Sequence, residues 1–256
     1  MTTFALRSYE LWLAQYRRVW RGTVVTSVVT PTLYLAALGV GLGTLVNRAA
    51  NAPGGGSYLD FVAPGLLASA AMQIAAQESA WPVLGAIRWT RTYFAQLATP
   101  LGIAHILAGH QLFVLTRVAV SSAAYLVVIA AFGGLHSPLA ALVPLAAILV
   151  GTAFSAPVAA FSARAKNDGA FNPLFRFGIF PMFLFSGTFF PVTRLPLPLE
   201  WLAYATPLWH GVELCRDLTL GRAAPLPDLG HAAYLALWTA VGLRLALASY
   251  RRRLVS

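Results

Sequence analysis

Long apolar runs separated by short polar segments extend through the whole chain. The runs are continuous and do not alternate with polar residues, which favours membrane-spanning helices over the strands of a β-barrel. We therefore predict an all-α, polytopic membrane protein with six transmembrane helices in one transmembrane domain, 23–250. The predicted spans are about 23–46, 58–80, 107–132, 138–161, 172–190 and 231–248.

The fifth predicted span is followed by an unusual segment. Prolines stop the run at Pro191 and recur at Pro196 and Pro198, and a second apolar stretch, 201–214, then begins. This stretch is well short of the ~20 residues that a crossing needs. We predict that 191–214 is an outer re-entrant segment of short helices between spans 5 and 6. Irregular backbone at membrane depth needs protein or a watery cavity around it, so we expect a gate or pathway rim here.

Residues 1–22 mix arginines with aromatic side chains, among them Tyr9, Trp12 and Tyr16. This pattern is typical of an amphipathic interfacial helix whose aromatic face dips into the membrane while its arginines face lipid phosphates. The alternative is a cytoplasmic extension of the first span. No short apolar core with a cleavage site precedes that span, so we expect no cleavable signal peptide.

Composition agrees with a membrane protein. Of the 256 residues, 58% are hydrophobic and 10% are charged, whereas about 25% are charged in a typical soluble domain. The single cysteine, Cys215, excludes an intrachain disulfide and a thiolate metal cluster.

The basic residues predict the orientation. If the N-terminus is cytoplasmic, 13 arginines and lysines fall on the inner side and 4 on the outer side, and Arg117 lies within a span. We therefore expect a multi-pass protein of the plasma (inner) membrane with both termini cytoplasmic and a basic cytoplasmic tail, 251–256. The net charge of +10 is then a topology signal. No soluble basic face is left for a nucleic-acid partner.

The chain lacks a phosphate-binding loop for ATP. Its one lysine, Lys166, is followed by Asn167 rather than by serine or threonine. His210, Glu213, Cys215 and Asp217 are close in sequence, but no second cluster completes a metal site. We predict a non-catalytic chain without cofactor or metal ligands, so that any ATP is bound by another subunit.

The cytoplasmic loop 81–105 is the best candidate for a partner contact. A short helix that ends near Thr99 and Pro100 would present Trp89, Tyr93 and Phe94 beside two arginines as knobs for a docking groove. The alternative is an interfacial helix resting on lipid headgroups.

Polar side chains interrupt the second and third spans. Ser69, Gln73 and Gln77 recur at every fourth position, so they either line a pathway or hydrogen-bond a neighbouring helix. Glu78 is expected to lie at the interface and to pair with Arg88 or Arg91. Arg117 could reach the cytoplasmic surface, pair with an acid or contact an anionic substrate.

Three motifs resemble those of ABC type-2 exporter permeases. They are FSGTFFP at 185–191, LAYATPL at 202–208 and HGVE at 210–213. The resemblance covers nearly the whole chain and is closest to the branch with nodulation lipo-oligosaccharide and daunorubicin exporters. The loop 91–101 resembles the cytoplasmic coupling helix of that family.

The resemblance implies a dimer of this permease with itself or with a related chain. It also implies two copies of an ABC ATP-binding subunit that hold ATP and Mg and receive the loop 81–100. The pathway would run between the first, second and fifth spans. The residues implied for ATPase coupling are Ile87, Arg88, Arg91, Tyr93 and Phe94, and those implied for the outer gate are Phe185, Phe189, Phe190, Trp201 and Tyr204.

We expect an ATP-driven exporter of an amphipathic molecule: a lipid, a lipid-linked saccharide or a hydrophobic drug. The alternative is a self-contained channel or secondary transporter that uses Arg117 and Glu78 as ion-linked groups. The shortage of acids within the spans weakens this alternative.

Overall fold

The computed structural model describes residues 2–48 and 56–255, and its described part is helical without any strand. Five helical stretches are long and apolar enough to cross a membrane. They are Trp20–Arg48, Tyr58–Arg88 (α4), Ile103–Ala131 (α6), Pro138–Arg164 and Pro225–Leu254 (α12). The all-α membrane class is confirmed, and five of the six predicted spans have a counterpart.

Two of these stretches are composite. Trp20–Arg48 contains α2 (Trp20–Tyr34), a π-helix (η1, Leu35–Leu42) and α3 (Gly43–Arg48). Pro138–Arg164 begins with a 3₁₀ turn (η3, Pro138–Leu142) that leads into α7 (Val143–Arg164).

α4 is longer than the predicted span 58–80. Its N-terminus is fixed by a capping box, in which the Asp60 N–H donates to Ser57 Oγ and the Ser57 N–H donates to Asp60 Oδ2, both at 3.1 Å. At the other end the helix continues through Pro82 to Arg88, because a single proline does not break a helix that neighbouring helices enclose. The helix therefore projects two further turns toward the predicted coupling loop.

The predicted span 172–190 is not a single membrane-length helix. It consists of α8 (Phe171–Pro173), a π-helix (η5, Leu174–Ile179) and α9 (Phe180–Phe185), preceded by a 3₁₀ turn (η4, Asp168–Ala170). These fifteen residues reach about 22 Å at 1.5 Å per residue, against a hydrocarbon core of about 30 Å. The helix ends there because the chain turns at Gly187, whose φ of 80° suits glycine.

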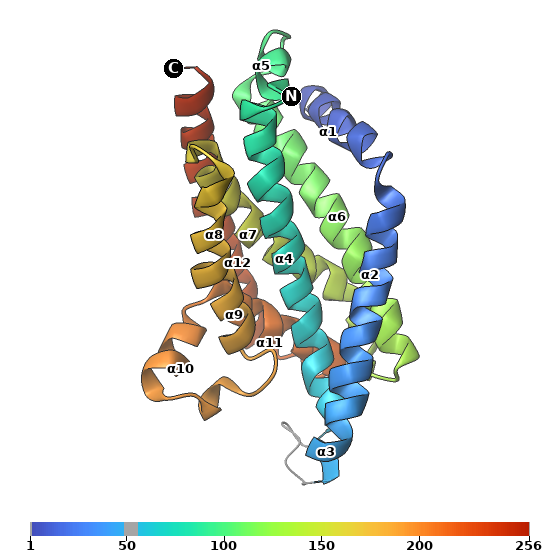
Figure 1. The fold of residues 1–256 in the computed structure, drawn as a ribbon. Coiled ribbons are helices and arrows are strands. Elements are labelled where there is room, and N and C mark those ends of the chain that lie inside the picture. The colour runs from blue at the N-terminus through green and yellow to red at the C-terminus, as the bar shows by residue number, and fades with distance from the viewer. Residues whose placement is uncertain (1, 49–55, 256) are drawn as a thin grey trace.

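Short helices follow α9. They are a 3₁₀ turn (η6, Val192–Arg194), α10 (Leu197–Tyr204) and α11 (Pro207–Leu220). Figure 1 shows α10, α11 and α3 at one end of the bundle, and α1 (Thr2–Tyr16), α5 (Thr92–Leu97) and the C-terminus at the other. We call the α5 end the inner end and the α11 end the outer end.

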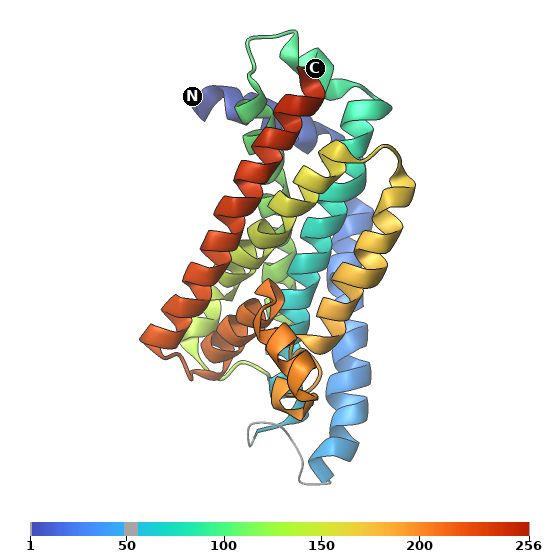
Figure 2. The same ribbon diagram turned by 90° about the vertical axis from the view of Figure 1, so that its left-hand side faces the viewer.

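α4 lies in the middle of the bundle and packs against α6, α7, α11 and η1. Glycine allows close approach between η1 and α4 and between α11 and α7. A methyl group at Gly39 would overlap the Leu59 side chain, and one at Gly211 would overlap Val150. Gly39 thus lets η1 approach α4 closely. In Figure 2 α12 runs alongside α7, with which it makes an extensive interface.

α1 packs on α6 at the inner end. Ser8 lies against Gly109, and the Trp12 ring is buried beside His110 and Phe113, with ring centroids 4.8 and 5.8 Å away. The prediction that the aromatic face of this helix dips into lipid is therefore wrong for Trp12, because α6 and α5 cover it.

Candidate functional site

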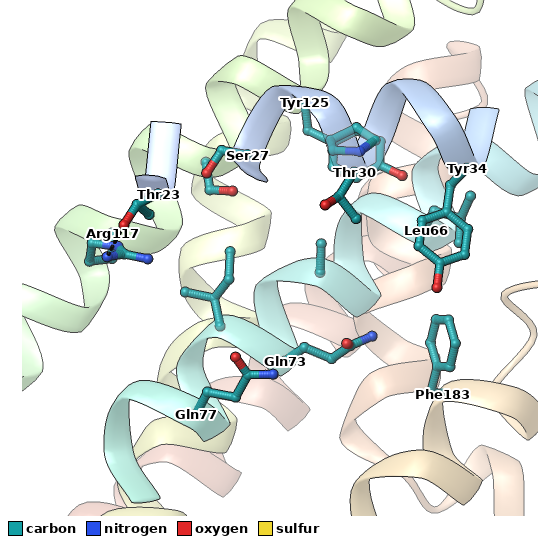
Figure 3. A pocket seen from close by; sticks show the side chains of 14 residues that line it. Thr23, Ser27, Thr30, Tyr34, Leu66, Gln73, Gln77, Arg117, Tyr125 and Phe183 are labelled. Atoms are coloured by element: carbon teal, nitrogen blue, oxygen red, sulfur yellow. Dashed lines mark hydrogen bonds between the residues drawn. The ribbon is translucent and has the colours of Figure 1, made fainter. Parts of the chain in front are cut away.

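A cavity of about 270 Å³ lies between α2, α4, α6 and α9 (Figure 3). Gln73 and Gln77 lie on α4 across from the hydroxyls of Ser27 and Thr30 on α2. Aliphatic and aromatic side chains complete the wall. The lining consists of Thr23, Ser27, Thr30, Pro31, Tyr34, Leu66, Ala70, Gln73, Ile74, Gln77, Arg117, Ser121, Tyr125 and Phe183. A mixed polar and apolar lining of this kind suits a ligand with both characters.

The three polar positions predicted on the second span separate into two environments. Gln73 and Gln77 line the cavity. Ser69 is fully buried, and its Oγ lies 2.9 Å from Thr188 Oγ1, so it holds a neighbouring segment instead. A pathway role for the two glutamines stays a prediction.

Arg117 closes the inner end of the cavity. Its Nη2 lies 3.3 Å from Glu78 Oε1, its Nη1 donates to Thr23 Oγ1 at 3.3 Å, and its guanidinium lies 4.6 Å from the Tyr16 ring centroid. The expected pairing of Glu78 with Arg88 or Arg91 is wrong, because Arg88 lies about three turns further along α4 and Arg91 lies beyond the end of that helix. Arg117 thus joins α1, α2 and α4 through its own helix, α6.

Residues 186–190, which we call the outer loop, close the opposite end against α4. Four side-chain hydrogen bonds hold the loop. Arg216 Nη2 donates to Gly187 O at 2.8 Å, and Tyr58 Oη donates to Phe189 O at 3.1 Å. The hydroxyls of Ser69 and Thr188 are hydrogen-bonded at 2.9 Å, and those of Ser186 and Thr206 at 3.0 Å. The backbones meet so closely that a methyl group at Gly65 would lie 3.0 Å from Thr188 Cα. The outer loop is therefore a fastened element of the fold.

Arg216 is the centre of this fastening. Only 6% of the residue is exposed, and its guanidinium also donates to Phe61 O and to Glu213 Oε1, the latter at 2.5 Å. The Phe61 ring centroid lies 4.0 Å from it. Burial of a charged group is costly unless it is paired and hydrogen-bonded, and here one side chain joins α4, the outer loop and α11. One signal of this pairing was present in the sequence and was not used: Glu213 and Arg216 are three residues apart, a spacing that places them together on a helix.

The five predicted gate aromatics do not form one cluster. Phe189 packs edge to face on Phe183, which lines the cavity, with ring centroids 5.0 Å apart. Trp201 is 70% exposed and packs edge to face against Tyr204, with ring centroids 6.2 Å apart. Phe185 is exposed and Phe190 is half-buried. Phe183, which the sequence analysis missed, is the residue that joins cavity and outer loop.

α11 carries the histidine and carboxylates that were excluded as a metal site. The described residues contain no group of three or more metal-ligating side chains. His210 Nδ1 instead faces His231 Nδ1 at 2.8 Å. Burial, together with the nearby carboxylates of Glu213 and Asp228, raises the pKa of Asp217 to about 7. The histidine contact attaches α11 to α12.

The inner end carries α5, which two contacts fasten to distant parts of the chain. Ser8 Oγ donates to Gln96 Oε1 at 2.8 Å, and Tyr93 Oη lies 3.5 Å from Tyr250 Oη. Tyr93 and Ile87 are buried, so the prediction that Tyr93 is an exposed knob is wrong. Both side chains hold the inner end of the bundle together from within.

Of the large side chains between α4 and α5 and on α5, Arg88, Trp89, Arg91 and Phe94 are exposed. Trp89 is 63% exposed. Arg91 has a φ of 53°, a left-handed conformation that costs a non-glycine residue free energy and often marks functional sites. The break it makes separates α4 from α5, which confirms a short separate helix before Thr99 and Pro100.

Comparison with known proteins gives a consistent result. Residues 6–220 match the family described as ABC-2 type transporter. The chain is similar to nodulation protein J of Rhizobium leguminosarum bv. trifolii, with 33% identity over 95% of this chain and 94% of the relative. It is also similar to nodulation protein J of Rhizobium meliloti (31%, over 95% and 94%) and of Bradyrhizobium diazoefficiens (28%, over 95% and 94%).

Proposed function

Since the chain belongs to the ABC-2 type transporter family, a family of membrane transport components, we propose that it is the permease of an ATP-driven exporter. Two copies of an ABC ATP-binding subunit would bind ATP and Mg and hydrolyse the nucleotide. A second permease, identical or related, would complete the membrane part. The chain itself supplies the route and no catalysis.

The cargo that fits is an amphipathic molecule, such as a lipid, a lipid-linked saccharide or a hydrophobic drug. The single observation that carries this choice is the lining of the cavity, where Gln73, Gln77 and Ser27 face Leu66, Ile74 and Phe183. A polar headgroup would pair with the amides and hydroxyls while its apolar part stays against the aliphatic wall.

The topology proposed for this function has six crossings, with both termini on the cytoplasmic side of the plasma membrane. The broken segment from α8 to α9 would be the fifth crossing, and α10 and α11 would be re-entrant on the outer side. Figure 1 supports this arrangement, because α1, α5 and the C-terminus lie at the same end of the bundle.

ATP-driven motion would enter at the exposed inner residues Arg88, Trp89, Arg91 and Phe94. Tyr93 would pass it to α12 through Tyr250, and Gln96 would pass it to α1 through Ser8. At the outer end, release of the outer loop from α4 would open the route next to Phe183 and Phe189.

The experiment is reconstitution of the chain in vesicles with and without the ATPase encoded beside it. We expect a stable complex and ATP-dependent movement of a fluorescent phospholipid analogue or of a cationic amphiphilic dye. Loss of movement in Gln73→Leu/Gln77→Leu, with the complex retained, would support the cavity as the route. Absence of any stable complex would contradict the proposal.

The same vesicles test the alternative of a self-contained channel or secondary transporter. Transport that follows an imposed proton or sodium gradient without the ATPase would favour it. The Glu78–Arg117 ion pair weighs against it, because each charge already has its partner inside the bundle.

A further inference from the structure

A second cavity, distinct from the proposed route, lies between α6 and α12. It is an open groove of about 480 Å³ with an almost entirely apolar lining. Only two of its lining residues, Gln111 and Arg244, are polar. The groove is lined by Ala104, Leu107, Ala108, Gln111, Leu112, Leu115, Leu243, Arg244 and Leu247.

The groove lies in the inner half of the bundle. Its α6 residues come from the first half of Ile103–Ala131, directly after α5, and its α12 residues are followed by Tyr250, which contacts Tyr93 of α5. Both walls are helices long and apolar enough to cross the membrane. The surroundings of the groove are therefore the lipid leaflet at the end that the charge bias predicts to be cytoplasmic.

Arg244 gives the groove a charge preference. Its side chain is exposed, and no ion pair in 2–48 and 56–255 involves it. Arg251 is also exposed and follows seven residues later, so that it lies on the same helix face about 10 Å closer to the inner end. Two cations beside an apolar groove between transmembrane helices match the chemistry of an anionic lipid headgroup above its acyl chain.

Gln111 adds a hydrogen-bonding group to the groove wall. Its Oε1 accepts from Ser155 Oγ at 2.5 Å, whereas its buried Nε2 has no partner among the described residues. An unpaired buried donor carries a free-energy cost that an acceptor oxygen relieves. The ester oxygens of a glycerophospholipid are acceptors of this kind.

We propose that this groove binds a phospholipid with an anionic headgroup, whose acyl chain lies against Leu112, Leu115 and Leu243 and whose phosphate is held by Arg244 and Arg251. The site is separate from the cavity of the transport route. It would act on the inner end of the bundle, because the lipid spans the joint between α6 and α12.

The test measures lipid retention by the full-length chain with native mass spectrometry. The chain is purified in detergent and supplied with dioleoyl phosphatidylglycerol or with dioleoyl phosphatidylcholine. We expect phosphatidylglycerol to be retained in preference, and Arg244→Gln to weaken its retention about fivefold. Arg194→Gln, an exposed arginine at the outer end, is the matched control and should have no effect.

A second pair of variants tests the acyl-chain site. Leu112→Trp fills the groove, whereas Val127→Trp adds the same bulk to an exposed position elsewhere on α6. Loss of the lipid in the first variant alone supports the site. Three outcomes would overturn the proposal. The unmodified chain could retain the two lipids equally, or retention could be unchanged in both Arg244→Gln and Leu112→Trp. The third outcome is that no lipid is retained and the chain forms dimers that Leu112→Trp abolishes.

Discussion

Phe183 and Phe189 meet edge to face, with ring centroids 5.0 Å apart, where the cavity reaches the outer loop. The first ring belongs to α9 and lines the cavity. The second belongs to the outer loop, and the backbone carbonyl of the same residue accepts a hydrogen bond from the Tyr58 hydroxyl. Any opening of the outer end along this route has to separate or displace these two rings. The pair therefore connects the candidate cargo site to the outer loop.

Phe183→Ala removes one half of this link. An edge-to-face pair contributes about 0.5–1.5 kcal/mol beyond its buried area, so we expect the closed outer end to be less favoured. Passive leak of a fluorescent amphiphile from vesicles, measured without ATP, should increase severalfold. Phe177→Ala, at a ring that is 75% exposed, is the control. A leak unchanged in both variants would contradict a closing role for Phe183.

Arg216→Ala should destabilise the protein more than any substitution of an exposed arginine. It leaves the Gly187 and Phe61 carbonyls without their donor and Glu213 without its partner. Loss of one member of a buried ion pair costs about 3–5 kcal/mol, which predicts a large drop in Tm in detergent. Arg194→Ala should leave Tm within about a degree of the unmodified chain.

If both variants lowered Tm equally, the fastening of the outer loop by Arg216 would be refuted. Arg216→Met/Glu213→Leu gives a further check, because replacing both charges with apolar groups leaves no unpaired charge behind. This double variant should recover part of the lost stability.

We expect the stability of the protein to depend on pH through the titration of Asp217. Burial, and then the neighbouring Glu213 and Asp228 carboxylates, raise its pKa to about 7, whereas an unfolded chain has the ordinary value near 3.9. The folded state therefore binds this proton more tightly than the unfolded state does. The stabilisation of the folded state by the protonated carboxyl is complete below pH ~4 and is lost as the pH rises through 7. Tm measured from pH 5 to pH 8.5 should fall across this range.

Asp217→Asn removes this titration, so the fall in Tm between pH 5 and pH 8.5 should become shallower. Asp168→Asn, at an exposed carboxylate outside α11, serves as control and should keep the slope of the unmodified chain. A slope that is the same in Asp217→Asn would show that another group carries the pH dependence.

Arg91 allows its backbone and its charge to be tested separately. Glycine adopts φ of 53° without the strain that arginine carries, so Arg91→Gly should raise Tm slightly, while Arg91→Ala keeps the strain. Both variants remove the charge at the proposed ATPase contact. ATP-driven transport should fall in both, and full transport in Arg91→Ala would remove this residue from the contact.

The hydrophobic pattern was sufficient for most of the fold. Continuous apolar runs predicted five of the long helices. The spacing of Gln73 and Gln77 left two roles open, pathway lining or a hydrogen bond to a neighbouring helix, and both residues line the cavity. The pattern predicted a single membrane span over 172–190, which is longer than the helical segment found there. Apolar side chains do not reveal the π-helix at Leu174–Ile179 or the positive φ at which the chain turns at Gly187.

Residues that act through long-range contacts could not be recognised from local patterns. Arg216 looked like one of four outer basic residues, yet its partners include Phe61, 155 positions earlier. Tyr93 was expected to be an exposed knob beside two arginines of the cytoplasmic loop, but Tyr250 and Trp12 cover it. Such pairings depend on which helices pack against each other, and the periodicity of a single helix does not predict its neighbours.

The distance in sequence between Phe61 and Arg216 also constrains how the protein is made. During synthesis α4 is made long before residue 216, so the Phe61 carbonyl lacks its guanidinium donor while the 154 intervening residues are added. The contact that fastens the outer end can therefore form only after α4, α6 and α7 have been made, and α12 follows it. A nascent chain stalled before α11 would expose an unfinished outer end to the quality-control proteases of the membrane.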